Sequence, residues 1–120
     1  MTQSDKDLLL KDLCSRLPHG VKIAMPGLWD SKTTIEPLNE IFKGDDGLFR
    51  VNGNGHCIEY IKPYLFPMSS MTKEQRKYIR DNYTFGATHE LFDWLDENKF
   101  DYRGLIPMGL AIDATNLNIY

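Results

Sequence analysis

The sequence predicts an α+β fold in which about three helices cover a small antiparallel sheet, a meander of three or four strands. Apolar residues recur at helical spacing near the N-terminus and at 89–98, and a helix-start signal lies at Thr72. Short segments rich in branched and aromatic residues lie between them, separated by glycine-containing turns. A last short strand is expected at 110–112. The 120 residues fit one domain, which we expect to span 1–120.

The first helix is expected over residues 5–17. Ser4 can cap it, with Asp7 as the partner three residues further on in a capping box. Pro18 ends the helix, because proline cannot continue it. The apolar side chains recur every three or four residues, and we expect this stripe to face the core: Leu9, Leu10, Leu13, Cys14 and Leu17.

The central part of the chain predicts four strands. Residues 21–25 alternate branched side chains and end at a Pro-Gly pair. Residues 33–42 form the second candidate, in which Pro37 cannot donate a ladder hydrogen bond and therefore belongs at an edge or a bulge. Two more strands are expected at 48–51 and 56–62, each after a glycine-containing turn. Such short connections are typical of an antiparallel meander.

Two further helices are expected at 73–82 and 89–98. Thr72 and Gln75 predict a capping box at the start of the first helix, and Thr88 can cap the second. The second helix is amphipathic, so its apolar side should dock on the sheet. Its apolar arc consists of Leu91, Phe92, Trp94 and Leu95, and its opposite, acidic arc consists of Glu90, Asp93, Asp96 and Glu97.

Composition and charge exclude several classes of protein. The net charge of −3 gives no general attraction to nucleic acid or to an anionic membrane, so any such contact needs a local patch. The longest uninterrupted apolar run, Leu8 to Leu10, is far too short to span a membrane. The first residues include no apolar signal region, and two cysteines are too few for a disulfide framework. We therefore expect a cytoplasmic protein with no membrane partner.

Two distinctive strings carry a resemblance. Residues 62–72 read KPYLFPMSSMT, and residues 100–106 read FDYRGLI, followed by GLA at 109–111. Both resemble a group of small uncharacterised proteins encoded in gut-bacterial genomes and their phages. The resemblance covers about a third of the chain. It implies a phage or mobile-element accessory protein and supplies no catalytic residues.

The helix at 73–82 carries four cations on one face. They lie at spacings i, i+3, i+4 and i+7: Lys73, Arg76, Lys77 and Arg80. Like charges at this spacing repel each other. The functional interpretation is a contact with phosphates or with an acidic partner. The alternative is a solvated helix face, partly offset by Glu74 and Asp81. The acidic arc of the following helix can also pair with this face in a second molecule, which makes a symmetric dimer a further alternative.

The segment after the last helix combines a carboxylate, a phenol and a guanidinium in Asp101, Tyr102 and Arg103. One interpretation is an anion- or peptide-binding corner in which Arg103 acts as a fork-shaped donor. The other is a structural role. In this role, Asp101 and Arg103 fix the segment by contacts with the rest of the chain, Tyr102 packs against neighbouring side chains, and Gly104 permits an unusual turn.

The sequence predicts no catalytic residues, no metal site and no cofactor. His56 and Cys57 are adjacent, and on a strand they point to opposite faces, so they cannot readily bind one ion. Ser69 and Ser70 lack the flanking glycines of a nucleophile elbow. Cys14 on the apolar stripe is more simply a small core residue.

These observations favour a non-catalytic protein-interaction module that binds an unknown protein partner. The first alternative is a nucleic-acid-binding protein that uses the basic face at 73–82, with weak affinity because the net charge is negative. The second alternative is a small enzyme whose site the sequence does not reveal.

Overall fold

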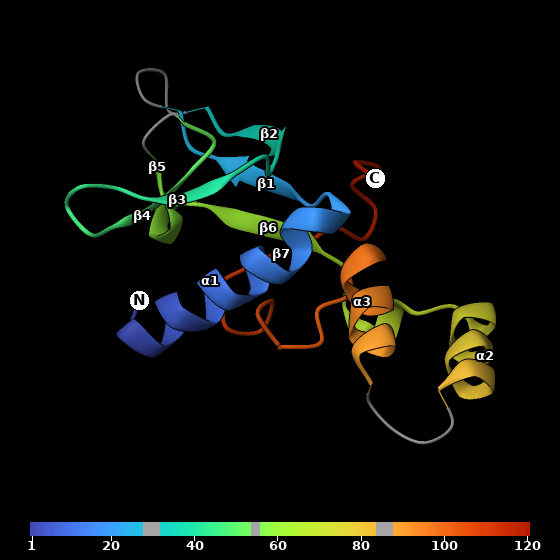
Figure 1. The fold of residues 1–120 in the computed structure, drawn as a ribbon. Coiled ribbons are helices and arrows are strands. Elements are labelled where there is room, and N and C mark those ends of the chain that lie inside the picture. The colour runs from blue at the N-terminus through green and yellow to red at the C-terminus, as the bar shows by residue number, and fades with distance from the viewer. Residues whose placement is uncertain (28–31, 54–55, 84–87) are drawn as a thin grey trace.

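The computed structural model describes residues 1–27, 32–53, 56–83 and 88–120. This part of the chain contains the α-helices α1 (Gln3–Arg16), α2 (Lys73–Asn82) and α3 (His89–Glu97). Its strands form two sheets, one of four strands and one of three (Figure 1). The predicted α+β class is therefore confirmed. None of the described helices is both long and apolar enough to cross a bilayer.

The larger sheet has β1 (Lys22–Met25) and β6 (Lys62–Leu65) at its centre. The strand β2 (Thr34–Pro37) pairs with β1 on one edge, and β7 (Ile112–Asp113) pairs with β6 on the other. The β1 strand is antiparallel to both neighbours, whereas β6 and β7 are parallel. Pro37 lies on an edge strand, as predicted from its missing N–H.

The smaller sheet is an antiparallel meander of β3 (Ile41–Lys43), β4 (Phe49–Val51) and β5 (His56–Cys57). The structure thus differs from the expected single sheet. The expected strand at 56–62 is also divided, because a 3₁₀ turn at Ile58–Tyr60 separates β5 from β6. The tip of the turn before β5, residues 54–55, lies outside the described residues.

Asn52 explains why the expected strand at 33–42 breaks in two. This residue adopts a left-handed conformation, with φ at 55°. Its side-chain oxygen accepts hydrogen bonds from the backbone N–H groups of Asn39, at 2.7 Å, and Glu40. Its side-chain nitrogen donates to the carbonyl oxygen of Pro37, at 2.8 Å. These bonds hold a corner between β2 and β3, so the chain leaves the larger sheet and starts the smaller one.

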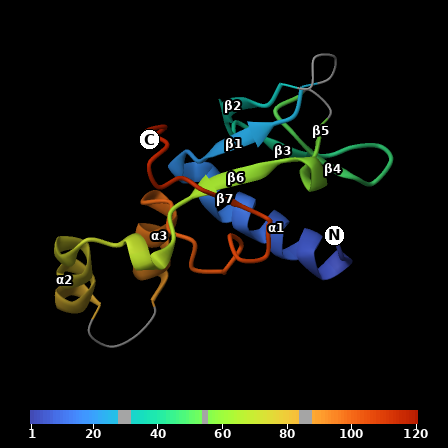
Figure 2. The same cartoon turned by 180° about the vertical axis from the view of Figure 1, so that it is seen from behind.

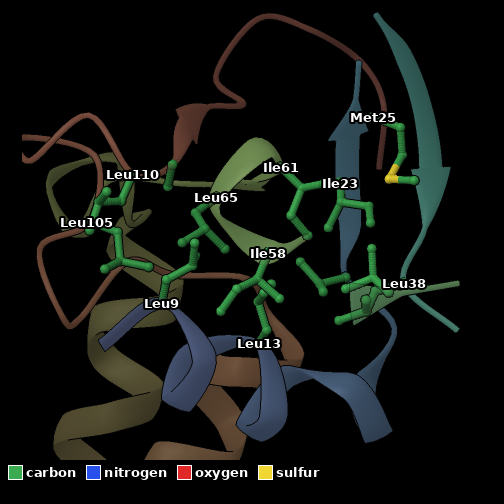
Figure 3. Packing of buried hydrophobic residues seen from close by; sticks show 13 residues of the cluster. Leu9, Leu13, Ile23, Met25, Leu38, Ile58, Ile61, Leu65, Leu105 and Leu110 are labelled. Carbon is green, nitrogen blue, oxygen red and sulfur yellow. The ribbon is translucent and has the colours of Figure 1, made fainter. Parts of the chain in front are cut away.

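The core lies between α1 and the strands. Leu9 and Leu13 of α1 are fully buried and face Ile58, Ile61 and Leu65 (Figure 3). Leu105 and Leu110, from the segment after α3, extend the same cluster. Burying apolar surface in this way is the main favourable term in folding.

The α1 helix starts two residues earlier than expected. Thr2, rather than Ser4, caps it, and Asp5 completes the capping box. Cys14 is exposed, so the prediction that it belongs to the core is wrong. The buried face of α1 instead includes two charged residues beside Leu9 and Leu13, namely Asp12 and Arg16. The apolar stripe read from the sequence was therefore centred on a neighbouring face.

The α2 helix stands away from the sheets, in both views of the ribbon (Figures 1 and 2). None of its residues is buried, so this helix does not cover the sheet. The α3 helix packs mainly against α1 and adds no residue to the core cluster beneath the strands, so the expectation that its apolar side docks on the sheet is wrong. The predicted capping box of Thr72 and Gln75 is present in α2, and Thr88 caps α3 as predicted.

Trp94 of α3 connects α2 to the rest of the molecule. Its ring stacks on Tyr78 of α2, with centroids 5.6 Å apart, and on Phe100, with centroids 5.8 Å apart. Trp94 is half-buried, and Tyr78 keeps 45% of its surface exposed. Two aromatic contacts of this kind contribute about 0.5–1.5 kcal/mol each beyond the apolar area that they bury.

We expect Trp94→Ala to release α2 before it unfolds the domain. The loss of both ring contacts should cost about 2–3 kcal/mol, and amide hydrogens of 73–82 should exchange with solvent much faster. Phe92→Ala is the matched control, because Phe92 lies on the same helix but is 39% exposed and contacts neither ring. Hydrogen exchange followed by mass spectrometry measures the protection of the amide hydrogens of 73–82 in both variants. Unchanged protection of 73–82 in Trp94→Ala would contradict the proposed attachment.

Candidate functional site

Four charged side chains meet where α1, α3 and the following turn come together. Asp12 and Arg16 come from α1, Asp96 from α3 and Arg103 from the turn. Asp12 and Arg16 are completely buried, and Asp96 is almost so. The cluster holds two positive and two negative groups, and a neutral set of this kind offsets part of the cost of removing each charge from water.

Arg16 is the centre of this cluster. Its Nε donates to Oδ2 of Asp12 at 2.9 Å, and its Nη2 donates to the carbonyl oxygen of Phe100 at 2.6 Å. Its Nη1 lies 3.9 Å from Oδ1 of Asp96 and has no hydrogen-bond partner among the described residues. One guanidinium therefore links α1 to α3 and to the backbone after α3.

Arg103 completes the cluster from the solvent side. Its Nη1 donates to Oδ1 of Asp12 at 2.8 Å and to the hydroxyl of Ser15 at 3.0 Å. The ring of Tyr102 lies close to both arginines, with Arg103 4.5 Å and Arg16 5.4 Å from the ring centroid. Its hydroxyl donates to Asp96 at 2.9 Å. Burial and this hydrogen bond both raise the pKa of Tyr102.

Asp101 forms a separate, local arrangement. Its two carboxylate oxygens accept from the backbone N–H groups of Leu105, at 2.8 Å, and Ile106, at 2.9 Å. Gly104 has φ at 77°, the left-handed conformation that glycine adopts most readily. The contacts of Asp101, Tyr102 and Arg103 therefore agree with the structural interpretation of this segment. A role in binding an anion or a peptide stays a prediction.

The predicted basic face of α2 is open to solvent. All four of its cations are exposed: Lys73, Arg76, Lys77 and Arg80. Arg76 turns back toward the start of the helix, where its guanidinium donates to the carbonyl oxygens of Met71 and Ser69 at 3.3 and 3.4 Å. Lys73, Lys77 and Arg80 extend from α2. Among the described residues, the shortest distance from any of these three cations to a carboxylate is the 3.9 Å between Arg80 and Asp81.

The acidic arc of α3 is smaller than expected. Asp96 turns inward to the cluster around Arg16, so its assignment to the exposed arc was wrong. Glu90, Asp93 and Glu97 remain exposed. The helical pattern misplaced Asp96 because an acidic residue at an arc boundary can face either water or a buried cation.

The residues considered for catalysis do not come together. The Nε2 of His56 lies 2.9 Å from the carbonyl oxygen of Pro26, while Cys57 lines a small cleft of about 170 Å³ beside α1. Lys6 and Glu59 also line that cleft, and an ion pair of 2.9 Å joins them. The described residues include no group of three or more histidine, cysteine or acidic side chains that could hold a metal ion.

Comparison of the chain with protein-family models, with curated proteins and with solved structures finds no match. Functional conclusions therefore depend on the geometry described above.

We expect Arg16→Met to destabilise the fold strongly. The substitution keeps a long apolar side chain but removes the buried donor to Oδ2 of Asp12 and to the Phe100 carbonyl, leaving the Asp12 carboxylate only its bond from Arg103 among the described residues. Breaking such a buried pair costs about 3–5 kcal/mol. Urea unfolding measures the change. Arg50→Met is the matched control, because Arg50 also pairs with an aspartate four residues away, at 2.7 Å, but near the surface. Equal unfolding midpoints for the two variants would contradict a structural role for Arg16.

Proposed function

We propose that the protein is a non-catalytic protein-interaction module, of the kind that a phage or mobile element encodes as an accessory protein. Its binding element is the basic face of α2, defined by Lys73, Arg76, Lys77 and Arg80. The observation that carries this proposal is that α2 has no buried residue and presents all four cations to solvent.

The partner surface that fits this face is acidic. The four cations repel one another across a single helix face, which costs a few tenths of a kcal/mol for each close pair. A helix of ten residues is also too short to be stable alone in water, since about 12–15 residues are needed. Carboxylates of a partner would relieve the repulsion and add contacts to a helix that the domain itself supports only weakly.

A compact acidic surface fits better than a long polyanion. The chain has a net charge of −3, so the positive potential is confined to the neighbourhood of α2. Glu90, Asp93 and Glu97 on the adjacent helix repel any anion that extends beyond this face. A protein partner with a short acidic patch avoids this repulsion.

We expect capture of a specific partner from extracts of the native host to depend on the basic face. Replacing Lys73, Arg76, Lys77 and Arg80 by glutamine should abolish capture while leaving the unfolding midpoint nearly unchanged, because these side chains face solvent. The charge-matched control replaces four exposed lysines elsewhere on the molecule by glutamine: Lys11, Lys32, Lys43 and Lys62.

The readout is quantitative mass spectrometry of the proteins bound after nuclease treatment. A partner retained by the wild type and by the control variant, but lost from the α2 variant, supports the proposal. Equal capture by all three proteins would contradict it, because the basic face would then play no part in binding.

Nucleic acid is the second candidate, since Lys73, Lys77 and Arg80 extend from one helix face. We expect weak or no binding near physiological salt. If the helix contacts three phosphates, a plot of the logarithm of the duplex-DNA binding constant against the logarithm of the salt concentration should have a slope of about −3. Fluorescence anisotropy at several salt concentrations measures this. Submicromolar binding of DNA that disappears in the α2 variant would make nucleic acid, rather than a protein, the favoured partner of the basic face.

A further inference from the structure

A cleft of about 380 Å³ lies between the start of α2 and the end of α3. Small-molecule sites typically have volumes of about 300–1,000 Å³. Three aromatic rings from separate parts of the chain line this cleft: Phe66, Phe100 and Tyr120. The ring centroids of Phe66 and Phe100 are 6.4 Å apart, and those of Phe66 and Tyr120 are 5.7 Å apart. The rings therefore form one group beside the cleft, here called the aromatic wall, in which Phe100 is almost fully buried.

Lys99 brings a positive charge to this cleft. Its ammonium group has three N–H donors, and two of them meet backbone carbonyl oxygens, those of His19 at 3.1 Å and Glu97 at 2.5 Å. Among the described residues, no carboxylate forms an ion pair with Lys99. Burial is the main cause that lowers the pKa of Lys99. The negative charge of Glu97 opposes this shift, and the guanidinium of Arg16 adds to it. The site thus holds a partly desolvated cation with one donor left for a ligand.

The backbone fixes the position of Lys99. Its φ of 62° lies in the left-handed region, which a lysine rarely adopts. Its carbonyl oxygen accepts from the N–H of Phe66 at 2.8 Å, and its own N–H donates to the carbonyl oxygen of Asp96 at 3.1 Å. The ammonium also lies 5.6 Å from the ring centroid of Tyr120. The N–H of Phe100 also donates to the carbonyl oxygen of Leu95 at 2.9 Å, so Lys99 is the left-handed residue of a Schellman motif that ends α3, and this helix end holds Lys99 in place.

We propose that this cleft binds a small aromatic monocarboxylate, whose ring packs on the aromatic wall and whose carboxylate accepts the third N–H of Lys99. Such a hydrogen bond between two charged groups is stronger than a neutral one. It would also give Lys99 a partner at ion-pair distance, which no carboxylate among the described residues provides, although the charge of Glu97 acts on Lys99 from further away. The site is separate from the basic face of α2, so the proposal goes beyond the protein interaction described above.

The other groups at the cleft limit the ligand to one negative charge. The exposed carboxylate of Glu97 also lines the cleft and repels a second charge on a ligand, which disfavours dicarboxylates and phosphates. The hydroxyl of Tyr120 accepts from the N–H of Lys22 and donates to the carbonyl oxygen of Tyr64. Burial raises the pKa of Tyr120 to about 12, so its phenol stays neutral and adds no charge at physiological pH.

The test is a titration of the isotopically labelled full chain with 3-phenylpropionate, followed by the backbone amide signals in NMR spectra. We expect saturable shifts concentrated at residues 66, 97–100 and 120. The neutral amide of the same acid, and acetate, which lacks the ring, should each bind about tenfold more weakly or worse, a loss of about 1.4 kcal/mol. Equal affinity for the acid and its amide, or no saturation at millimolar concentrations, would overturn the proposal.

Two variants test the charges separately. Lys99→Met should weaken binding of the acid about tenfold and leave binding of the amide unchanged, whereas Glu97→Gln should strengthen binding of the acid. Lys62→Met is the matched control, because Lys62 is an exposed lysine on β6 that does not line the cleft. Full affinity for the acid in Lys99→Met would overturn the proposal. If that variant fails to fold, the comparison of acid and amide on the wild type still decides.

The two proposals fail independently. The variant with four glutamines on α2 should bind 3-phenylpropionate like the wild type, because none of those four residues lines the cleft. Loss of the acid in that variant would show that α2 must carry its charges for the cleft to form, and would overturn the separation of the two sites.

Discussion

The buried guanidinium of Arg16 is the contact on which the arrangement of the helices depends. It pairs with Asp12 within α1, lies 3.9 Å from Asp96 of α3, and donates to the carbonyl oxygen of Phe100 after α3. A fully buried arginine is stable only when hydrogen bonds and opposite charges replace its water. Because Asp96 and Phe100 are distant in the sequence from Arg16, forming this cluster requires α1, α3 and the chain after α3 to reach their positions together.

A row of stacked aromatic rings connects the Arg16 cluster to α2. Phe100, whose carbonyl binds Arg16, stacks on Trp94, and Trp94 stacks on Tyr78 of α2. In the other direction the row continues through Phe66 to Tyr120. The rings attach α2 along one side only, and its capping box stabilises its first turn. This one-sided attachment leaves the basic face exposed and leaves the cleft open between α2 and the end of α3.

Local signals made the helices predictable, whereas long-range pairing was not. Thr72, Gln75 and Thr88 act on backbone groups a few residues away, so their caps could be recognised in the sequence. The division into two sheets depends on Asn52 binding the backbone near residue 39, which no periodic pattern reveals. The pair of Asp12 and Arg16 shared a face with Leu9 and carried a usable signal, but a search for apolar residues alone assigned the exposed Cys14 to the core instead.

For the candidate sites too, the sequence revealed which residues are charged but not which charges meet in the fold. The exposed cations of α2 were predictable, because a basic helix face far from apolar neighbours has no place in a core. Arg103 and Asp96 looked equally polar in the sequence, yet they contact the buried pair on α1. Lys99 gave no signal at all, since its surroundings come from residues near 19, 66 and 120. A charged residue becomes a candidate binding group where the fold brings it beside other side chains that can contact a ligand, and most of those around Lys99 are distant in the sequence.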